Sequence, residues 1–220
     1  MNWGALLLLL IWLIGRPPGV EGQATFWQGQ TGGWDTPGNW DNGVPNSSTT
    51  ANIDNGGTVF VQNGGNTSSG LLVGNFGTGS LVVQGQGQLS SGDPVVIGFL
   101  SNSDGTVSDG TVSVNGSRSI FTAAGYVEVG AFGTGKLTIE NGGSALTDGY
   151  LQIGLFSGGD GTVVVNGPGS SLISDGDIVV GGSGTGRLSI ENGGAVTGNG
   201  SARLFECGWQ CLSWRDVATA

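Results

Sequence analysis

The stretch GTGKLTIENGG at residues 133–143 returns almost unchanged as GTGRLSIENGG at residues 184–194. Within KLTIE, the apolar side chains of Leu137 and Ile139 alternate with polar ones. Such alternation is typical of a β-strand with one buried face, and Asn-Gly favours a tight turn. The motif therefore predicts a strand and a turn, and its return predicts that the chain is built from repeated units.

The repeat extends over most of the chain when it is aligned on an apolar triplet that ends in glycine, as in LLVG, VVIG, VEVG, LQIG and IVVG. A degenerate earlier copy occupies residues 51–70. Units of roughly 20–30 residues made only of strands and turns are typical of solenoids in which each unit forms one coil. We therefore predict an all-β fold, a single-stranded parallel β-helix of about six short coils over residues 51–200. The anchor glycines are Gly74, Gly98, Gly130, Gly154 and Gly181.

Stacking explains why the units resemble one another. Coils about 4.8 Å apart place equivalent residues above each other, so each inward position needs a side chain that packs on its own kind. Repetition is thus a packing requirement, and it does not by itself indicate a binding code.

Composition limits the possible partners and chemistry. The 220 residues include 47 Gly and no His, and the net charge is −10. Between residues 25 and 200 the basic residues are Arg118, Lys136 and Arg187, which argues against nucleic acid or an anionic membrane as partner. Without His, a catalytic Cys–His pair and a His-ligated metal are both excluded. We predict no cofactor and no metal site.

The N-terminus is typical of export. An apolar run from Ala5 to Gly15 is too short to span a bilayer, and Gly22 and Ala24 form a small-x-small cleavage pattern. We predict that residues 1–24 are a signal peptide and that the mature chain has no membrane span. The alternative is a buried N-terminal helix.

A tryptophan-rich segment precedes the repeats. Residues 25–50 contain Trp27, Trp34 and Trp40 in a polar, glycine-rich context. A solenoid exposes the end of its core, and three aromatic side chains could cover that end as an N-terminal cap. The same side chains could instead stack on sugar rings as ligand contacts. The sequence leaves both interpretations open.

The opening FWQGQTGGWDTPGNWDNGVPN, together with units of the form VxVGxxGTGxLTIENGG, resembles the passenger regions of bacterial autotransporters. The repeat family is the one associated with type V secretion and with PEP-CTERM surface proteins, and the resemblance covers residues 25–200. It implies a right-handed β-helix, secreted or displayed at the outer membrane of a Gram-negative-type bacterium, with an adhesin-like or surface-structural role. The implied partners are a host or neighbouring-cell surface, or its glycans. The resemblance supplies no catalytic residues.

The C-terminal residues 201–220 depart from the repeat. They contain both cysteines, Cys207 and Cys211, and end in neither an outer-membrane barrel nor a PEP-CTERM anchor. This change predicts an atypical tail and an incomplete, truncated or frame-shifted protein.

An enzyme is the alternative function, because β-helices also host polysaccharide lyases and hydrolases that use clustered carboxylates. Four acids precede anchor glycines and would stack near one edge, namely Asp93, Asp148, Asp175 and Asp177. Paired carboxylates could act in glycoside hydrolysis or hold Ca²⁺, but turn chemistry also explains Asp beside Gly. We therefore predict a non-enzymatic protein without catalytic residues, an adhesion module or a simple spacer. The candidate ligand contacts are Asp148, Asp175 and the three tryptophans.

Overall fold

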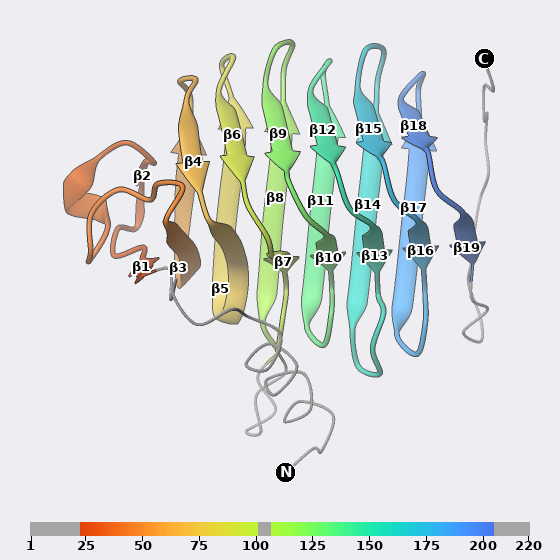
Figure 1. The fold of residues 1–220 in the computed structure, drawn as a ribbon, viewed down its shortest axis with the longest axis horizontal. Helices are drawn as coiled ribbons and strands as arrows, with labels where there is room; N and C mark the ends of the chain where they lie inside the picture. Colours follow the sequence, from red (N-terminus) through yellow and green to blue (C-terminus); the bar gives the residue numbers. More distant parts are fainter. Residues whose placement is uncertain (1–22, 101–106, 205–220) are drawn as a thin grey trace.

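The computed structural model describes residues 23–100 and 107–204. These residues form a right-handed parallel β-solenoid of about seven turns with almost no helix. In Figure 1 the coils stand side by side along a rod, with the N-terminal strands at one end and β19 at the other. The predicted all-β, parallel β-helical fold is confirmed. The predicted signal peptide up to residue 22, together with Cys207 and Cys211, lies outside the described residues.

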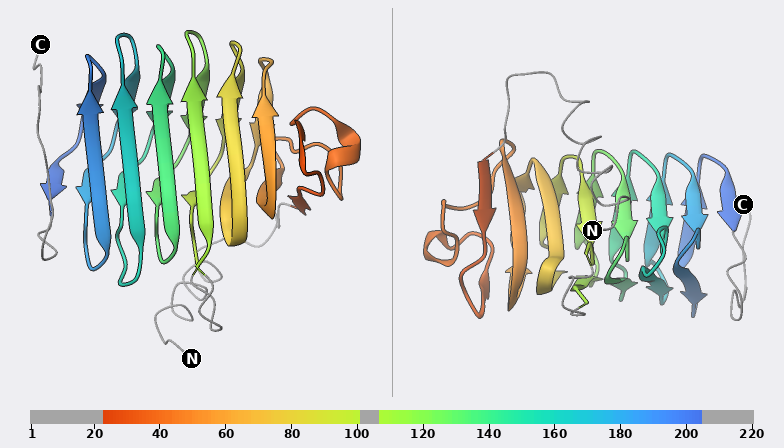
Figure 2. Two further views of the ribbon diagram at one scale, coloured as in Figure 1. Left: turned by 180° about the vertical axis from the view of Figure 1, so that it is seen from behind. Right: turned by 90° about the horizontal axis from the view of Figure 1, so that it is seen from below.

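Each coil contributes strands to three faces. The triplet face consists of β7 (Val95–Ile97), β10 (Val127–Val129), β13 (Leu151–Ile153), β16 (Ile178–Val180) and β19 (Ala202–Leu204). The long face consists of β8 (Asp109–Asn115), β11 (Thr134–Glu140), β14 (Asp160–Asn166) and β17 (Thr185–Glu191). The side face consists of β4 (Asn66–Ser68), β6 (Gln88–Ser91), β9 (Ile120–Ala123), β12 (Ser144–Thr147), β15 (Ser171–Ser174) and β18 (Ala195–Gly198). The side face is the upper row of labels in Figure 1, and the long face is the row of long arrows in Figure 2, left.

Two long strands join the triplet face to the long face near the N-terminal end. They are β3 (Thr49–Val61) and β5 (Gly70–Gln84), which pair with each other. The first part of β5 pairs with β7 and its last part with β8, so one strand bends around the corner that later coils make with a turn. As a result, the triplet and long faces belong to one 13-stranded sheet, and the side face is a separate 6-stranded sheet.

The register explains why the motif at residues 133–143 returns at residues 184–194. Its two copies lie in β11 and β17, on either side of β14. Leu137 faces inward between Val112 and Val163, and all three side chains are buried. Like residues therefore stack on like residues in the core, as the sequence predicted. Since neighbouring strands pair in parallel and in register, each coil satisfies the backbone hydrogen bonds of the next.

The NGG motif occurs at Asn63, Asn141 and Asn192, and at two of these positions the asparagine itself takes a left-handed backbone conformation. Asn141 and Asn192 adopt positive φ of 55° and 50°, which asparagine tolerates better than most residues. Each also donates a side-chain hydrogen bond to the preceding coil, Asn141 Nδ2 to Asn115 Oδ1 at 3.0 Å and Asn192 Nδ2 to Asn166 Oδ1 at 2.8 Å. In the turn after Asn63, it is Gly65 that takes the positive φ.

The tryptophan-rich segment closes the N-terminal end of the core. Trp27, Trp34 and Trp40 are 1%, 1% and 4% exposed, and Trp40 packs edge-on against each of the other two at 5.1 Å between ring centroids. Its indole Nε1 also donates a hydrogen bond to the backbone oxygen of Trp34 at 2.8 Å. These contacts support the cap interpretation.

The prediction of about six coils was low by about one. The stack extends past the predicted residues 51–200 at both ends. At the N-terminal end, the cap strands β1 (Gln23–Phe26) and β2 (Thr31–Gly33) both pair in parallel with β3. At the other end, β19, which lies in the predicted atypical tail, pairs in register with β16. Between β2 and β3 lies the short 3₁₀ helix η1 (Pro37–Asn39). The cap is thus a partial coil that continues the sheet, although its sequence lacks the repeat motif.

Candidate functional site

The corner where the side face turns into the triplet face carries the chain's two tyrosines. Tyr126 and Tyr150 directly precede β10 and β13, which pair in register, so they occupy equivalent positions in successive coils. Their rings are stacked, with centroids 5.5 Å apart and planes 10° from parallel. Tyr150 is 44% exposed, whereas Tyr126 is half-buried. The pair is therefore a fixed aromatic surface with one ring accessible.

Glu128 lies beside these rings on the triplet face. It is the outward residue of β10, between Val96 of β7 and Gln152 of β13. Burial and, to a lesser extent, the negative charge of Asp93 raise the pKa of its carboxyl to about 7. Near neutral pH, the Glu128 carboxyl is therefore populated in both its protonated and its ionised form.

Asp93 reaches the same corner from the preceding coil. Its side chain lies against Gly125, where an added Cβ would come within 2.5 Å of the Asp93 Cβ and Cγ. Glycine at position 125 thus makes room for the carboxyl beside Tyr126. Burial raises the pKa of Asp93, and a hydrogen bond from the backbone of Tyr126 partly offsets this rise.

These four residues, Asp93, Tyr126, Glu128 and Tyr150, are called here the tyrosine–carboxyl cluster. The pKa of each tyrosine is raised by burial and by the charges of Glu128 and Asp93, so both hydroxyls stay protonated at neutral pH. The cluster therefore combines hydrogen-bond acceptors and negative charge with an accessible ring. Sequence reasoning identified Asp93 as an edge acid but missed the other three. The available signal was Tyr before the triplets VEVG and LQIG, and the acidic residue inside the first of them.

The raised pKa of Glu128 makes stability depend on pH. The folded protein holds this proton more tightly than the unfolded chain, so the free energy of unfolding decreases as pH rises from about 4.5 to about 7. We expect a loss on the order of 2–3 kcal/mol across this window from Glu128. Urea unfolding at several pH values measures it, with Glu128→Gln as the comparison. The interpretation is wrong if the variant keeps the same pH slope as the parent protein.

The other edge acids, Asp148, Asp175 and Asp177, also precede triplets at this corner, and two of them, Asp175 and Asp177, have structural partners. Asp148 and Asp175 are exposed and precede successive triplets. Asp175 Oδ1 accepts a hydrogen bond from Asn199 Nδ2 at 2.7 Å, and Asp177 Oδ1 accepts one from the backbone N–H of Ser201 at 2.7 Å. These bonds tie a turn to the next coil. Within residues 23–100 and 107–204, no three or more Cys, Asp or Glu gather as a metal site would require.

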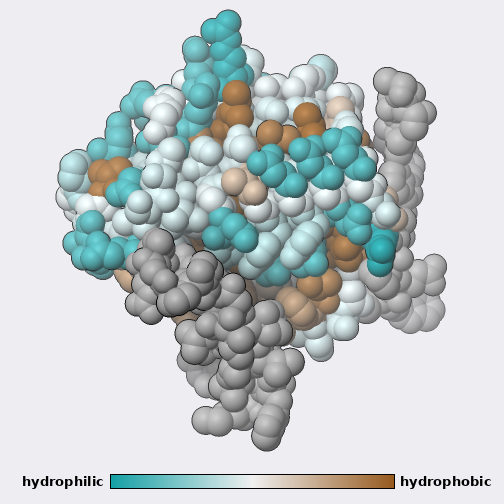
Figure 3. Space-filling model, in the orientation of Figure 1, coloured by the Kyte–Doolittle hydropathy of each residue, from teal (hydrophilic) through white to brown (hydrophobic). Residues whose placement is uncertain are grey.

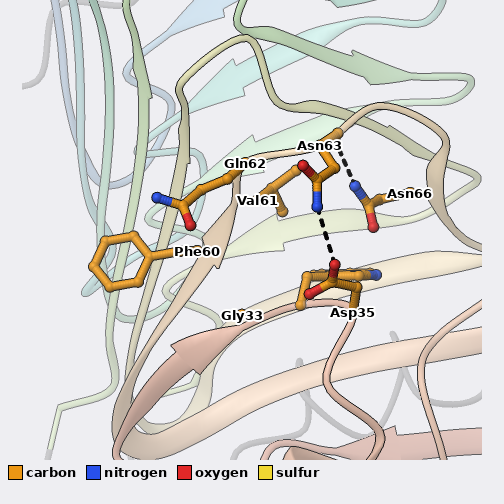
Figure 4. A pocket seen from close by; sticks show the side chains of 8 residues that line it. Gly33, Asp35, Phe60, Val61, Gln62, Asn63 and Asn66 are labelled. Atoms are coloured by element: carbon orange, nitrogen blue, oxygen red, sulfur yellow. Dashed lines mark hydrogen bonds between the residues drawn. The ribbon is translucent and has the colours of Figure 1, made fainter.

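A small cavity lies between the cap and β3 (Figure 4). Its volume of about 30 Å³ suits one or two waters and is too small for a sugar ring. Asn63 Nδ2 donates a hydrogen bond to Asp35 Oδ2 at 3.0 Å across it, and the buried indole Nε1 of Trp34 has no hydrogen-bond partner in the described part of the chain. The ring faces of the three cap tryptophans are covered, so this structure does not support the alternative that they stack on sugars.

Comparison with known proteins gave no family assignment. The sequence matches no model of a known protein family, and comparisons with curated proteins and with solved structures gave no match. In the described ranges, no helix is long and apolar enough to cross a membrane.

Proposed function

We propose that this protein is a non-enzymatic module of an exported bacterial surface protein, an adhesin-like or surface-structural passenger. The proposal rests on the solenoid architecture, on the apolar N-terminal run and on the resemblance to autotransporter repeats. A solenoid of this kind offers extended faces on which binding residues can be displayed.

The observation that carries the proposal is the contrast between inward and outward rows of the long face. The inward row is uniformly aliphatic, formed by Val112, Leu137, Val163 and Leu188. The neighbouring outward row changes from coil to coil, formed by Thr111, Lys136, Thr162 and Arg187. The scaffold is therefore uniform where it packs and variable where it meets solvent. On the coloured surface in Figure 3, which is the opposite side of the rod, hydrophobic residues form small, separate patches.

Export is tested by expressing the full chain in a Gram-negative host. We expect the protein outside the cytoplasm, with its N-terminus processed near Ala24. A double variant, Leu7→Arg with Leu9→Arg, interrupts the apolar run and should leave the protein unprocessed in the cytoplasm. Cell fractionation and mass spectrometry of the purified protein read out both results. An unprocessed, cytoplasmic parent protein contradicts the proposal.

A carbohydrate-active enzyme is the second candidate, and the tyrosine–carboxyl cluster is the observation that favours it. With a pKa of about 7, Glu128 could act as a general acid, and the neighbouring Asp93 could act as the second carboxylate. The test is release of reducing ends from pectin-like and other acidic glycans. An enzyme is favoured over the adhesin if the protein releases reducing ends, if Glu128→Gln abolishes this activity and if the Asp148→Asn variant remains active.

A further inference from the structure

The tyrosine–carboxyl cluster has an accessible aromatic ring held in a fixed orientation. One side of Tyr150 is stacked on Tyr126, and both residues are fixed by the adjoining paired strands β10 and β13. Almost half of Tyr150 remains exposed, at 44%. An aromatic ring of this kind attracts cations and packs against the C–H face of a sugar. Little side-chain freedom is left to lose on binding, which favours affinity.

The carboxyl groups give this corner its negative charge. Glu128 is faced by Tyr126 from its own coil, by Asp93 from the preceding coil and by Tyr150 and Gln152 from the next. Within the described residues, Asp93 is the one charged group that shifts the pKa of Glu128, and the charge of Asp93 is negative. A bound cation would relieve this repulsion, and ionised carboxylates accept the hydrogen bonds that an ammonium group donates.

We propose that the tyrosine–carboxyl cluster binds the primary ammonium group of an amino-sugar unit in a glycan, an inference that rests on the proposed adhesin-like function. The ammonium group donates hydrogen bonds to Glu128 and Asp93, and the sugar ring packs against Tyr150. A quaternary ammonium group is a poorer match, because it has no N–H to donate and is bound by cages of several rings. The net charge of −10 further attracts a polycationic glycan.

The experiment uses the full chain and calorimetric titration with a glucosamine oligosaccharide. The fully N-acetylated oligosaccharide of the same length is the matched probe without ammonium groups. We expect at least tenfold weaker binding of the acetylated probe, and at least tenfold weaker binding of the amino probe by Tyr150→Ala and by Glu128→Gln. Two control variants should bind as the parent does. Phe76→Ala removes another exposed ring, and Glu191→Gln removes a carboxylate from the long face.

A second titration measures the binding of methylammonium at several pH values. Like a lysine side chain, methylammonium stays protonated through neutral pH. Its binding should strengthen as pH rises through about 7, the pKa of Glu128, and Glu128→Gln should remove this dependence. Circular dichroism of each variant separates a loss of binding from a loss of folding.

Several outcomes would overturn the inference. They are equal affinity for the amino and acetylated probes, unchanged affinity in correctly folded Tyr150→Ala and Glu128→Gln, or no binding of the amino probe at all. The proposed function has its own test. A protein that is exported and mediates cell attachment equally well with Tyr150→Ala would retain the adhesin role and contradict this site. A cytoplasmic protein that binds the amino probe through the cluster would instead support this site and contradict the adhesin role.

Discussion

Gly154→Val is expected to prevent folding or to lower the free energy of unfolding by more than about 4 kcal/mol. Gly154 adopts a φ of +65°, and an added Cβ would overlap the backbone carbonyl of Thr185 in the next coil. The β-branched side chain would therefore add backbone strain to a steric clash that neither coil can relieve without breaking their pairing. Circular dichroism melting and urea unfolding measure the loss. An unchanged melting curve would show that the anchor glycines are dispensable.

Substitutions at two further glycines separate the effect of backbone strain from that of the steric clash. Gly85 has a φ of +61° with nothing within 4 Å of an added Cβ, so Gly85→Val should cost only the strain of a left-handed residue, about 1–2 kcal/mol. Gly64 lacks a positive φ, and the nearest atom to its added Cβ is Gln88 Oε1 at 3.7 Å. Gly64→Val should therefore change stability by less than about 0.5 kcal/mol. A loss at Gly64 as large as that at Gly154 would refute the steric explanation.

Trp40→Ala is expected to cost about 3–5 kcal/mol, because it removes a buried ring from the cap. Trp40 contacts both Trp27 and Trp34, so its loss exposes the end of the core to water. Urea unfolding measures the total cost. Hydrogen exchange should show the loss of protection beginning at β1 to β3, next to the cap, before it reaches β14.

Trp40→Phe is the matched comparison. It retains an aromatic ring but removes the indole hydrogen bond to the Trp34 backbone and leaves unfilled space, so it should cost less than the alanine variant, about 1–3 kcal/mol. If Trp40→Ala retains the parent stability, the cap does not close the core. If it instead lowers glycan binding while stability is unchanged, the ligand-contact interpretation of the tryptophans is restored.

The repeats were predictable because their information is local. The alternation around Leu137 identified the buried side of a strand, and the glycine after the triplet identified the end of β7, β10, β13 and β16. Gly74 differs, because it lies inside β5 where that strand bends. All five anchor glycines, Gly74, Gly98, Gly130, Gly154 and Gly181, adopt positive φ. The partial coil at the cap was missed because QATF and TGG carry no triplet or NGG motif. Their pairing with β3 depends on tertiary contacts, and a short strand without periodicity is weakly encoded.

The candidate site was less predictable, since its residues come from two different kinds of position. Tyr126 and Tyr150 follow a turn, whereas Glu128 takes the outward place inside an apolar triplet. Only the register between β10 and β13 shows that these side chains are neighbours. The loss of water around Glu128, which sets its pKa, depends on the packed structure and leaves no mark in the sequence.

In-register pairing also determines how such a protein can change its length. Each inward row continues unchanged if one whole coil is removed, because Val112 would meet Val163 as well as it now meets Leu137. Removing a single residue from a strand would instead turn its apolar side chains to the solvent. Recombination between similar units, such as the copies at residues 133–143 and 184–194, therefore yields shorter or longer rods with intact cores. The reach of the protein can vary in evolution while its fold stays the same.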